Sequence, residues 1–452
     1  MNQSPATTGQ NVFFLSFRKR DLRLLFDFRV PFRPVRVVVG ERRINLRETD
    51  MRIVRSKSFY ISSCPLLNKK ESDAAVSKRW LMAKLYGKEY TKAELLARVG
   101  DISQIARIKP YRLIEGREDG VMALDITNGG GLSFTVIPSR GMDISAAHYN
   151  GRSLAWRSSV GDAHPAYFDH EGENGRGWLR SFPGGLVTTC GLSWAGATDV
   201  EDGQRYGLHG RISNLPAENV RWHGNWHGDD YVLSVYGEVR QTTVFGENLI
   251  LRREIFTRLG SSSFVINDFV ENCGFNSTPH MMLYHINIGF PAVNDNARLI
   301  SPSRKVMPRD ADAEGKIDRY AMMQAPEVGY RETVYFHDLV PDKDEYVQAA
   351  VVDDSTFSGD PNNPGFGVYC RYAAEKLPRF IEWKMMGAGT YVVGMEPANC
   401  SVMGRPEERN TGALQYIEPG EERHYDLEIG VLNGAEEIAA FEAQCSAALA
   451  NG

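Results

Sequence analysis

Three short segments of the chain contain side chains that could transfer protons. Gly207-Leu208-His209-Gly210-Arg211 and Tyr284-His285-Ile286-Asn287 each hold a histidine, and Met395-Glu396-Pro397 holds a glutamate. A positioned histidine or carboxylate acting as general acid or base contributes roughly 10²–10⁴-fold to a rate. We therefore predict an acid–base site with Glu396, His285 and His209 as the catalytic residues. No motif with metal-ligand or phosphate-loop spacing accompanies them, so we expect no metal and no cofactor.

Side-chain alternation along a strand separates the histidines of residues 281–290 and their flank. His285 and Asn287 fall on one face, whereas His280 and Tyr284 fall on the other. We expect His285 to face the site together with polar Asn287, and His280, which follows a proline at the strand start, to be structural.

Glu396 ends the apolar segment 391–395, where its carboxylate is expected to point as a core side chain would. A buried charge is costly unless it is partnered or functional. His209 lies between glycines, which let a backbone approach a ligand closely. Taken singly, each histidine fits a structural role better than a functional one, and Glu396 fits the two equally well.

Arginine and tryptophan side chains lie close to several glycine-rich turns. Aromatic faces stack on the C–H surfaces of sugars, and guanidinium groups bind hydroxyls in fork geometry. We predict a small-molecule sugar or sugar derivative as the ligand. The predicted substrate-binding residues are Arg140, Trp178, Arg180, Arg211, Asn287 and Trp383.

Composition restricts the class of protein. The chain has 452 residues, 42% hydrophobic and 24% charged, with a net charge of −5. These values are ordinary for a globular protein and give no reason to expect a nucleic acid or a membrane as partner. The six cysteines are widely spaced without a C-x-x-C pair, which argues against a thiolate zinc site and favours the cytoplasm.

The N-terminal segment differs from the rest in charge. Residues 1–81 contain 17 Lys and Arg against 7 Asp and Glu, a net charge of +10, which leaves −15 for residues 82–452. We expect residues 1–81 to be a basic extension with little fold of its own, disordered or upstream of a start at Met82. A helix should follow, because Thr91 and Glu94 form a capping box and Gly100 can end it.

The body of the chain, residues 82–452, is predicted to be all-β. Short β-type runs are separated by turn pairs such as Asn-Gly and Asp-Gly, and they do not alternate with helices. No repeat of 40–50 residues supports a propeller. We expect one large antiparallel β-sandwich with a few short helices, one of them near residues 435–449. The expected strands are residues 120–126, 132–137, 231–239, 249–257, 263–271, 346–352, 367–372, 391–396 and 424–431.

The order of the three segments resembles that of the galactose-mutarotase superfamily, in which a His-Gly turn, a strand histidine and a Glu-Pro sequence follow one another. Residues 82–452 look most like a bacterial branch of aldose-1-epimerase-like proteins. The matching segments are Ile137-Pro138-Ser139-Arg140-Gly141-Met142-Asp143, Phe182-Pro183-Gly184-Gly185-Leu186 and Gly207-Leu208-His209-Gly210-Arg211. The asparagine-arginine segment that precedes the turn in characterised mutarotases is absent here.

This resemblance implies the supersandwich fold of galactose mutarotase and an isomerase that interconverts sugar anomers. It implies that Glu396 removes the proton of the C1 hydroxyl, that His285 donates a proton to the ring oxygen, and that His209 orients that oxygen. Two other classes stay open: a non-catalytic sugar-binding protein, and a cupin-type isomerase with His209, His280, His285 and Glu396 as metal ligands.

The charge boundary leads to a prediction about truncation. A chain that begins at Met82 should unfold at the same temperature as the full chain, because the extension is expected to contribute no core. Thermal unfolding of both proteins measures this, and a markedly lower melting temperature of the shorter chain would contradict it.

Overall fold

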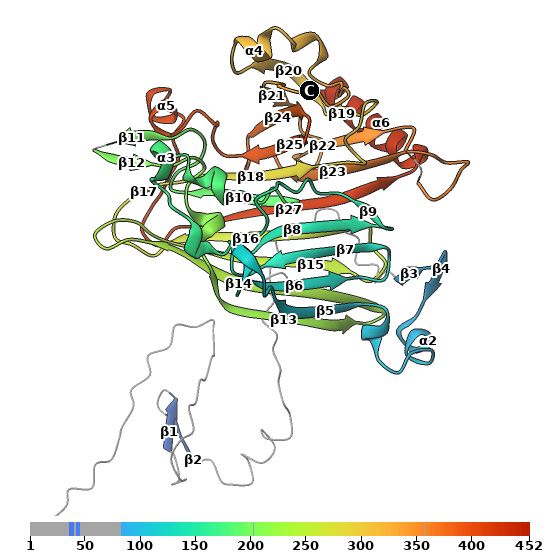
Figure 1. The fold of residues 1–452 in the computed structure, drawn as a ribbon. Coiled ribbons are helices and arrows are strands. Elements are labelled where there is room, and N and C mark those ends of the chain that lie inside the picture. Colours follow the sequence, from blue (N-terminus) through green and yellow to red (C-terminus); the bar gives the residue numbers. More distant parts are fainter. Residues whose placement is uncertain (1–35, 40–41, 46–82, 202, 357) are drawn as a thin grey trace, which may run out of the picture. The chain divides into compact units, whose positions relative to one another are not determined.

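The computed structural model describes residues 36–39, 42–45, 83–201, 203–356 and 358–452. The chain divides into two compact units, Met1–Asp73 and Ala74–Gly452. In the first unit, β1 (Arg36–Val39) pairs antiparallel with β2 (Arg42–Asn45). The expectation of an extension over residues 1–81 otherwise lies outside the described residues, and the second unit carries everything that follows (Figure 1).

Two large sheets form the second unit, and all their strand pairings are antiparallel. In spatial order, the eleven-stranded sheet contains β20 (Ser303–Pro308), β21 (Thr333–Leu339), β24 (Arg379–Gly387), β25 (Thr390–Ala398), β18 (Met281–Ile288), β10 (Val187–Leu192), β8 (Asp143–Tyr149), β7 (Leu132–Ile137), β6 (Met122–Thr127) and β5 (Arg107–Arg112), with β9 (Arg152–Ser153) beside β8. The eight-stranded sheet contains β13 (Ala217–His227), β14 (Asp230–Thr242), β15 (Asn248–Arg258), β16 (Ser263–Asn272), β27 (Glu422–Asn433), β23 (Phe366–Ala373), β22 (Tyr346–Asp353) and β19 (Arg298–Ile300).

Short elements complete the unit at the edges of these sheets. The small strand pairs are β3 (Ala83–Leu85) with β4 (Lys88–Tyr90), β11 (Asp199–Glu201) with β12 (Gln204–Tyr206), and β17 (Thr278–Pro279) with β26 (Tyr416–Ile417). The α-helices are α2 (Lys92–Leu96), α3 (Gly172–Gly175), α4 (Ala311–Glu314), α5 (Arg405–Asn410) and α6 (Ala435–Asn451). Among the described residues, no helix combines the length and the apolar composition needed to cross a membrane.

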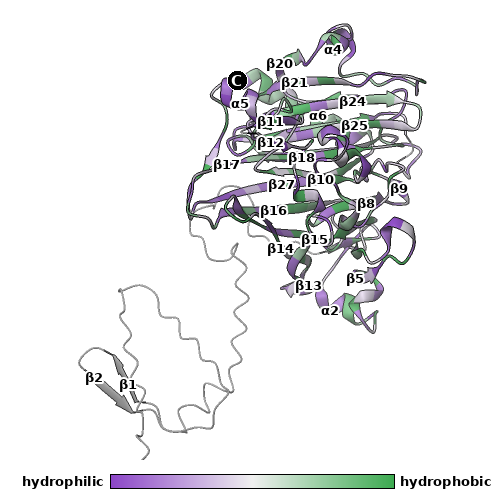
Figure 2. Cartoon of the chain, turned by 60° about the vertical axis from the view of Figure 1, so that its left-hand side comes forward, coloured by the Kyte–Doolittle hydropathy of each residue, from purple (hydrophilic) through white to green (hydrophobic). Residues whose placement is uncertain are grey.

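The hydrophobic core lies between the two large sheets. Phe134 of β7 meets Phe264 of β16 with ring centroids 4.6 Å apart, and both belong to one large buried cluster. Figure 2 shows hydrophobic residues gathered along the strands, whereas many loops are hydrophilic. Because successive side chains of a strand point to opposite faces, the larger sheet can fill this core with one face and present the other face to a separate site.

A buried arginine connects the two sheets through hydrogen bonds. Arg253 of β15 has no solvent exposure and donates to both carboxylate oxygens of Asp268 at 2.8 and 2.7 Å. It also donates to Asp143 of β8 at 3.1 Å and to the Thr189 hydroxyl of β10 at 2.8 Å. The Tyr284 hydroxyl of β18 donates to Asp268 at 2.6 Å. This network thereby fixes β18, which carries His285, and its neighbours β10 and β8 to the second sheet.

The expected all-β sandwich with a few short helices is confirmed, and its strands agree with the expected runs to within a few residues. The capping box of Thr91 and Glu94 is present at the start of α2, but that helix ends earlier than expected, at Leu96. One expectation was wrong: Glu396 lies inside β25, because Pro397 and Ala398 continue the strand.

Replacement of Arg253 should destabilise the fold strongly. Arg253→Met leaves Asp268 and Asp143 buried without their cation, which typically costs about 3–5 kcal/mol. Urea unfolding measures this cost. Arg304→Met, at an exposed pair with Asp338 on β20 and β21, is the control and should cost less than about 1 kcal/mol. Equal costs for the two variants would contradict the role of the network.

Candidate functional site

Strand β18 separates the core from the site. Its residues Met282, Tyr284, Ile286 and Ile288 pack into the core between the sheets. Met281 and Leu283 instead pack with Trp178 and Phe182 in a second buried cluster on the other face of the larger sheet. His285 shares that second face, as the alternation predicted.

The register between β18 and β25 brings the imidazole and the carboxyl together. Ile286 pairs with Met395, so the neighbouring His285 lies opposite Glu396. The His285 Nε2 and Glu396 Oε1 atoms are 3.2 Å apart, with side chains only 6% and 2% exposed. Glu396 therefore faces the site side of the sheet and not the core between the sheets, although it is as buried as a core residue.

Gly394 makes room for this pair within β25. A Cβ atom at this position would lie 2.8 Å from Glu396 Oε1 and 3.1 Å from the Trp383 Cβ. Any larger residue would push the carboxyl or the indole out of place. The glycine two residues before Glu396 is therefore part of the local requirement for the site.

A turn with left-handed backbone conformation delivers His209. His209 has φ = 57° and Gly210 has φ = 76°. A Cβ atom at Gly210 would lie 2.2 Å from the carbonyl oxygen of Trp194, so only glycine fits there. The turn places the His209 ring 5.6 Å from the His285 ring, nearly perpendicular to it. Its buried Nδ1 has no hydrogen-bond partner among the described residues.

Aromatic side chains surround the two histidines and the carboxyl. Trp178 stacks on Phe182 at 4.2 Å and lies 4.7 Å from His209, centroid to centroid. The ring of His285 lies 5.3 Å from Phe182 and 5.2 Å from Trp383. Trp156, 6.2 Å from Trp383, completes this cluster. Such rings offer apolar faces to a sugar and keep water from the proton-transfer groups.

Burial determines the protonation of the site. It raises the pKa of Glu396 to about 8, with a further contribution from Glu332 that the charge of Arg309 opposes. Burial lowers the pKa of His209 to about 4 and that of His285 well below its ordinary value. Near neutral pH, the free protein therefore holds one shared titratable proton on the pair, mainly at Glu396, beside a neutral His285.

The remaining predicted substrate-binding residues lie around this cluster with different contacts. Asn287 donates to the carbonyl oxygens of His285 and Gly185, at 2.9 and 3.0 Å, and so fixes the end of β18. Arg180 is exposed and ion-paired with Glu173. Arg211 is partly buried and lies near His170, whose pKa is lowered to about 4 by burial and by this positive charge. The substrate roles of these residues stay predictions.

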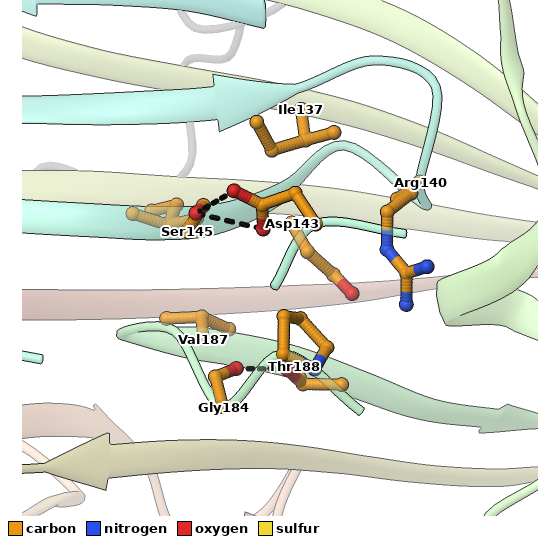
Figure 3. Close-up of a pocket in the computed structure, with 10 residues that line it drawn as sticks. Ile137, Arg140, Asp143, Ser145, Gly184, Val187 and Thr188 are labelled. Carbon is orange, nitrogen blue, oxygen red and sulfur yellow. Dashed lines mark hydrogen bonds between the residues drawn. The ribbon is translucent and has the colours of Figure 1, made fainter. Parts of the chain in front are cut away.

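Arg140 lines a small hollow that adjoins the site (Figure 3). It is 2% exposed, and it donates to the carbonyl oxygens of Ala163 and Ser181 at 2.5 and 2.6 Å. Thr188, which also lines the hollow, is the cross-strand partner of His285. Arg140 thus holds the segment that carries Phe182, and its predicted contact with substrate stays a prediction. The hollow is lined by Ile137, Arg140, Asp143, Ile144, Ser145, Asp162, Pro183, Gly184, Val187 and Thr188.

His280 does not join the other histidines. Its ring nitrogens lie 3.1 Å from the Leu192 carbonyl oxygen and 2.7 Å from the Tyr425 hydroxyl, so both are occupied by structural partners. The four-ligand metal site of the cupin-type alternative is therefore not assembled. In the part of the chain that the structure describes, no group of three or more His, Cys, Asp or Glu side chains could hold a metal ion.

Several site residues were not predicted from sequence. Trp156 lacks a signal beyond its aromatic character, because only the folded loops bring it to Phe182 and Trp383. Phe182 belongs to a segment that matches the family resemblance, but it was not predicted as a site residue. Glu332 and Arg309 lie beside strands β21 and β20, which the sequence analysis did not predict. A search for aromatic residues next to Pro-Gly-Gly turns would have found Phe182.

Similarity to known structures shows the family to which the fold belongs. A Klebsiella pneumoniae subsp. pneumoniae protein proposed to be an aldose 1-epimerase is 27% identical, with a TM-score of 0.71 over 76% of this chain and 87% of that one. A galactose mutarotase-like protein from Clostridium acetobutylicum is 13% identical, with a TM-score of 0.50 over 73% and 99%. The chain has the galactose mutarotase-like fold, and the resemblance found in its motifs is confirmed.

The family described as a domain of unknown function (DUF4432) matches residues 118–431, and the chain belongs to this family. The match includes all three proton-transfer segments. No curated protein matches the chain.

The raised pKa of Glu396 predicts a pH-dependent stability difference. Between the unfolded pKa of 4.5 and the folded value of about 8, the folded protein binds a proton that the unfolded chain does not. The unfolding free energy should therefore fall with rising pH, by up to about 1.4 kcal/mol per pH unit from this group. Glu396→Gln removes this contribution.

Urea unfolding at pH 5, 6.5 and 8 measures the difference between Glu396→Gln and the wild type. The variant should gain stability relative to the wild type as the pH rises. A difference that stays constant across this range would show that the carboxyl is not desolvated in the folded protein.

Proposed function

We propose that the protein is an isomerase of the aldose 1-epimerase type, which interconverts sugar anomers by opening and reclosing the ring. The observation that carries the proposal is the buried pair of His285 and Glu396, 3.2 Å apart, inside an aromatic enclosure. An acid and a base at one point suffice for this reaction, and the fold is that of galactose mutarotase-like proteins.

The reaction requires one titratable proton on the pair of His285 and Glu396, which is the number that the pair holds near neutral pH. With the sugar bound, Glu396 as carboxylate takes the proton of the C1 hydroxyl while protonated His285 gives its proton to the ring oxygen. The bond between C1 and the ring oxygen breaks, and a free aldehyde forms. This step leaves Glu396 protonated and His285 neutral, which is the state that burial favours in the free protein. Rotation about C1–C2 and the reverse transfers close the ring on the other face.

His209 and the aromatic side chains would serve the same step. The Nδ1 of His209, which has no protein partner among the described residues, would bind the ring oxygen or a neighbouring hydroxyl, and Trp178 and Trp383 would stack on the C–H faces of the sugar. We infer a cytoplasmic location and a sugar or sugar derivative as the only ligand that the reaction requires.

Substitution of the pair tests the proposal. Glu396→Gln keeps the volume but removes the base, so anomer interconversion should fall by about 10²-fold or more while sugar binding is largely kept. His285→Asn should behave alike. The double variant should be little worse than either single variant, because the two residues act as a unit. Exchange NMR on a sugar that binds gives the rates.

His280→Asn is the matched control: His280 directly precedes β18, and its ring contacts Tyr425 of the second sheet, away from the site. It should lower stability, because it breaks the contacts to Leu192 and Tyr425, yet leave the turnover of the folded protein nearly unchanged. Loss of turnover in His280→Asn together with full turnover in Glu396→Gln would refute the assigned roles.

A further inference from the structure

The ion pair of Glu332 and Arg309 lies at the edge of the site and is hydrogen-bonded to Trp383, one of the aromatic residues of the site. The indole Nε1 of Trp383 donates to Glu332 Oε2 at 2.8 Å. The other carboxylate oxygen of Glu332 accepts from Arg309 Nη2 at 3.1 Å, and Arg309 Nε donates to Asp310 at 2.8 Å. Four side chains from three segments, Trp383, Glu332, Arg309 and Asp310, are thus linked in one hydrogen-bonded chain.

The strand register connects this hydrogen-bonded chain, through Trp383, to the pair of His285 and Glu396. Glu332 directly precedes β21, and Arg309 directly follows β20, with its backbone N–H donating to the Val334 carbonyl at 2.9 Å. Val334 pairs with Trp383 across β21 and β24, and both lie on the site face. The Trp383 ring in turn meets the His285 ring edge to face, at 76°.

We propose that Glu332 and Arg309 are positioning residues of the acid–base site: Glu332 holds the Trp383 indole against His285, and the opposite charges of the pair balance the field at Glu396. The consequence for catalysis rests on the proposed function, whereas the consequence for the Glu396 carboxyl does not. Neither residue belongs to the three segments that contain the proton-transfer groups.

The other groups that face Glu396 do not supply this field. His285 and His209 are neutral near pH 7, because burial lowers the pKa of both. Cys190 of β10 and Cys400 after β25 also lie within electrostatic range, and burial raises the pKa of both thiols, which keeps them neutral. The charges of Glu332 and Arg309 remain, and they act on the pKa of Glu396 in opposite directions.

Two charge-removing substitutions should move the titration of Glu396 in opposite directions. Glu332→Gln keeps an acceptor for the indole but leaves Arg309 uncompensated, so the pKa of Glu396 should fall by on the order of half a unit. Arg309→Gln leaves Glu332 uncompensated, so the same pKa should rise by a similar amount. The double variant should return close to the wild type. Because the Glu332 side chain is 47% exposed, added salt should shrink both shifts.

The experiment follows the Glu396 carboxyl directly by NMR in full-length protein labelled with ¹³C-glutamate, with the resonance assigned by its loss in Glu396→Gln. Arg304→Gln and Asp338→Asn, at an exposed ion pair on the same two strands, are the controls and should not move the titration. Unmoved titrations in Glu332→Gln and Arg309→Gln, or shifts in the same direction, would overturn the proposal.

The readout separates this proposal from the proposed function. Opposite shifts support the positioning role even if no sugar is turned over, in which case the epimerase proposal alone fails. In an active protein, the alkaline limb of the kcat profile should follow the same shifts, because activity is lost when the pair gives up its shared proton.

Discussion

The geometry of the site depends most on the hydrogen bonds that the guanidinium group of Arg253 makes to both sheets. This group is fully buried between the sheets and binds Asp268 of β16, Asp143 of β8 and Thr189 of β10. Tyr284, which shares Asp268, directly precedes His285. A buried arginine is stable only when all its donors are satisfied in good geometry. This charged network on the core face of the larger sheet therefore fixes β18, which carries His285, together with the neighbouring β10 and β8.

On the site face of the larger sheet, a cluster of aromatic rings buries His285 and Glu396 and so determines their protonation. Desolvation favours neutral groups, so it raises the pKa of the Glu396 carboxyl and lowers that of the His285 imidazole. The pair therefore keeps one proton over a wide pH range around neutrality. Such a pair suits a reaction that moves one proton off a substrate oxygen and another onto a second oxygen, because ring opening changes the protonation of both residues and ring closure restores both.

The sequence predicted the fold and the faces of single strands better than it predicted contacts between them. Alternation correctly predicted that His285 of β18 faces the site and that His280, which directly precedes β18, does not, because this pattern is local to one segment. The opposition of His285 and Glu396 depends on the register between β18 and β25, which are more than a hundred residues apart and carry no mutual signal. The motif resemblance supplied that link.

The same limit explains the residues that were missed and those whose contacts differ. Trp156, Glu332 and Arg309 reach the site only through pairings of strands and loops that local patterns do not encode. Arg140 was predicted from its glycine-rich surroundings to bind substrate, whereas its guanidinium donates to two backbone carbonyls. An arginine beside a glycine-rich turn can hold that turn as readily as it can hold a ligand.

Exchange NMR with the wild-type protein and a panel of aldoses and sugar phosphates tests whether the protein interconverts sugar anomers. Magnetisation transferred between the α and β anomers reports interconversion without a coupled assay. The account predicts that at least one sugar of the panel exchanges anomers faster with the protein than without it. Sugars that bind, as seen from line broadening, while none of them exchanges faster would contradict it and leave a sugar-binding protein.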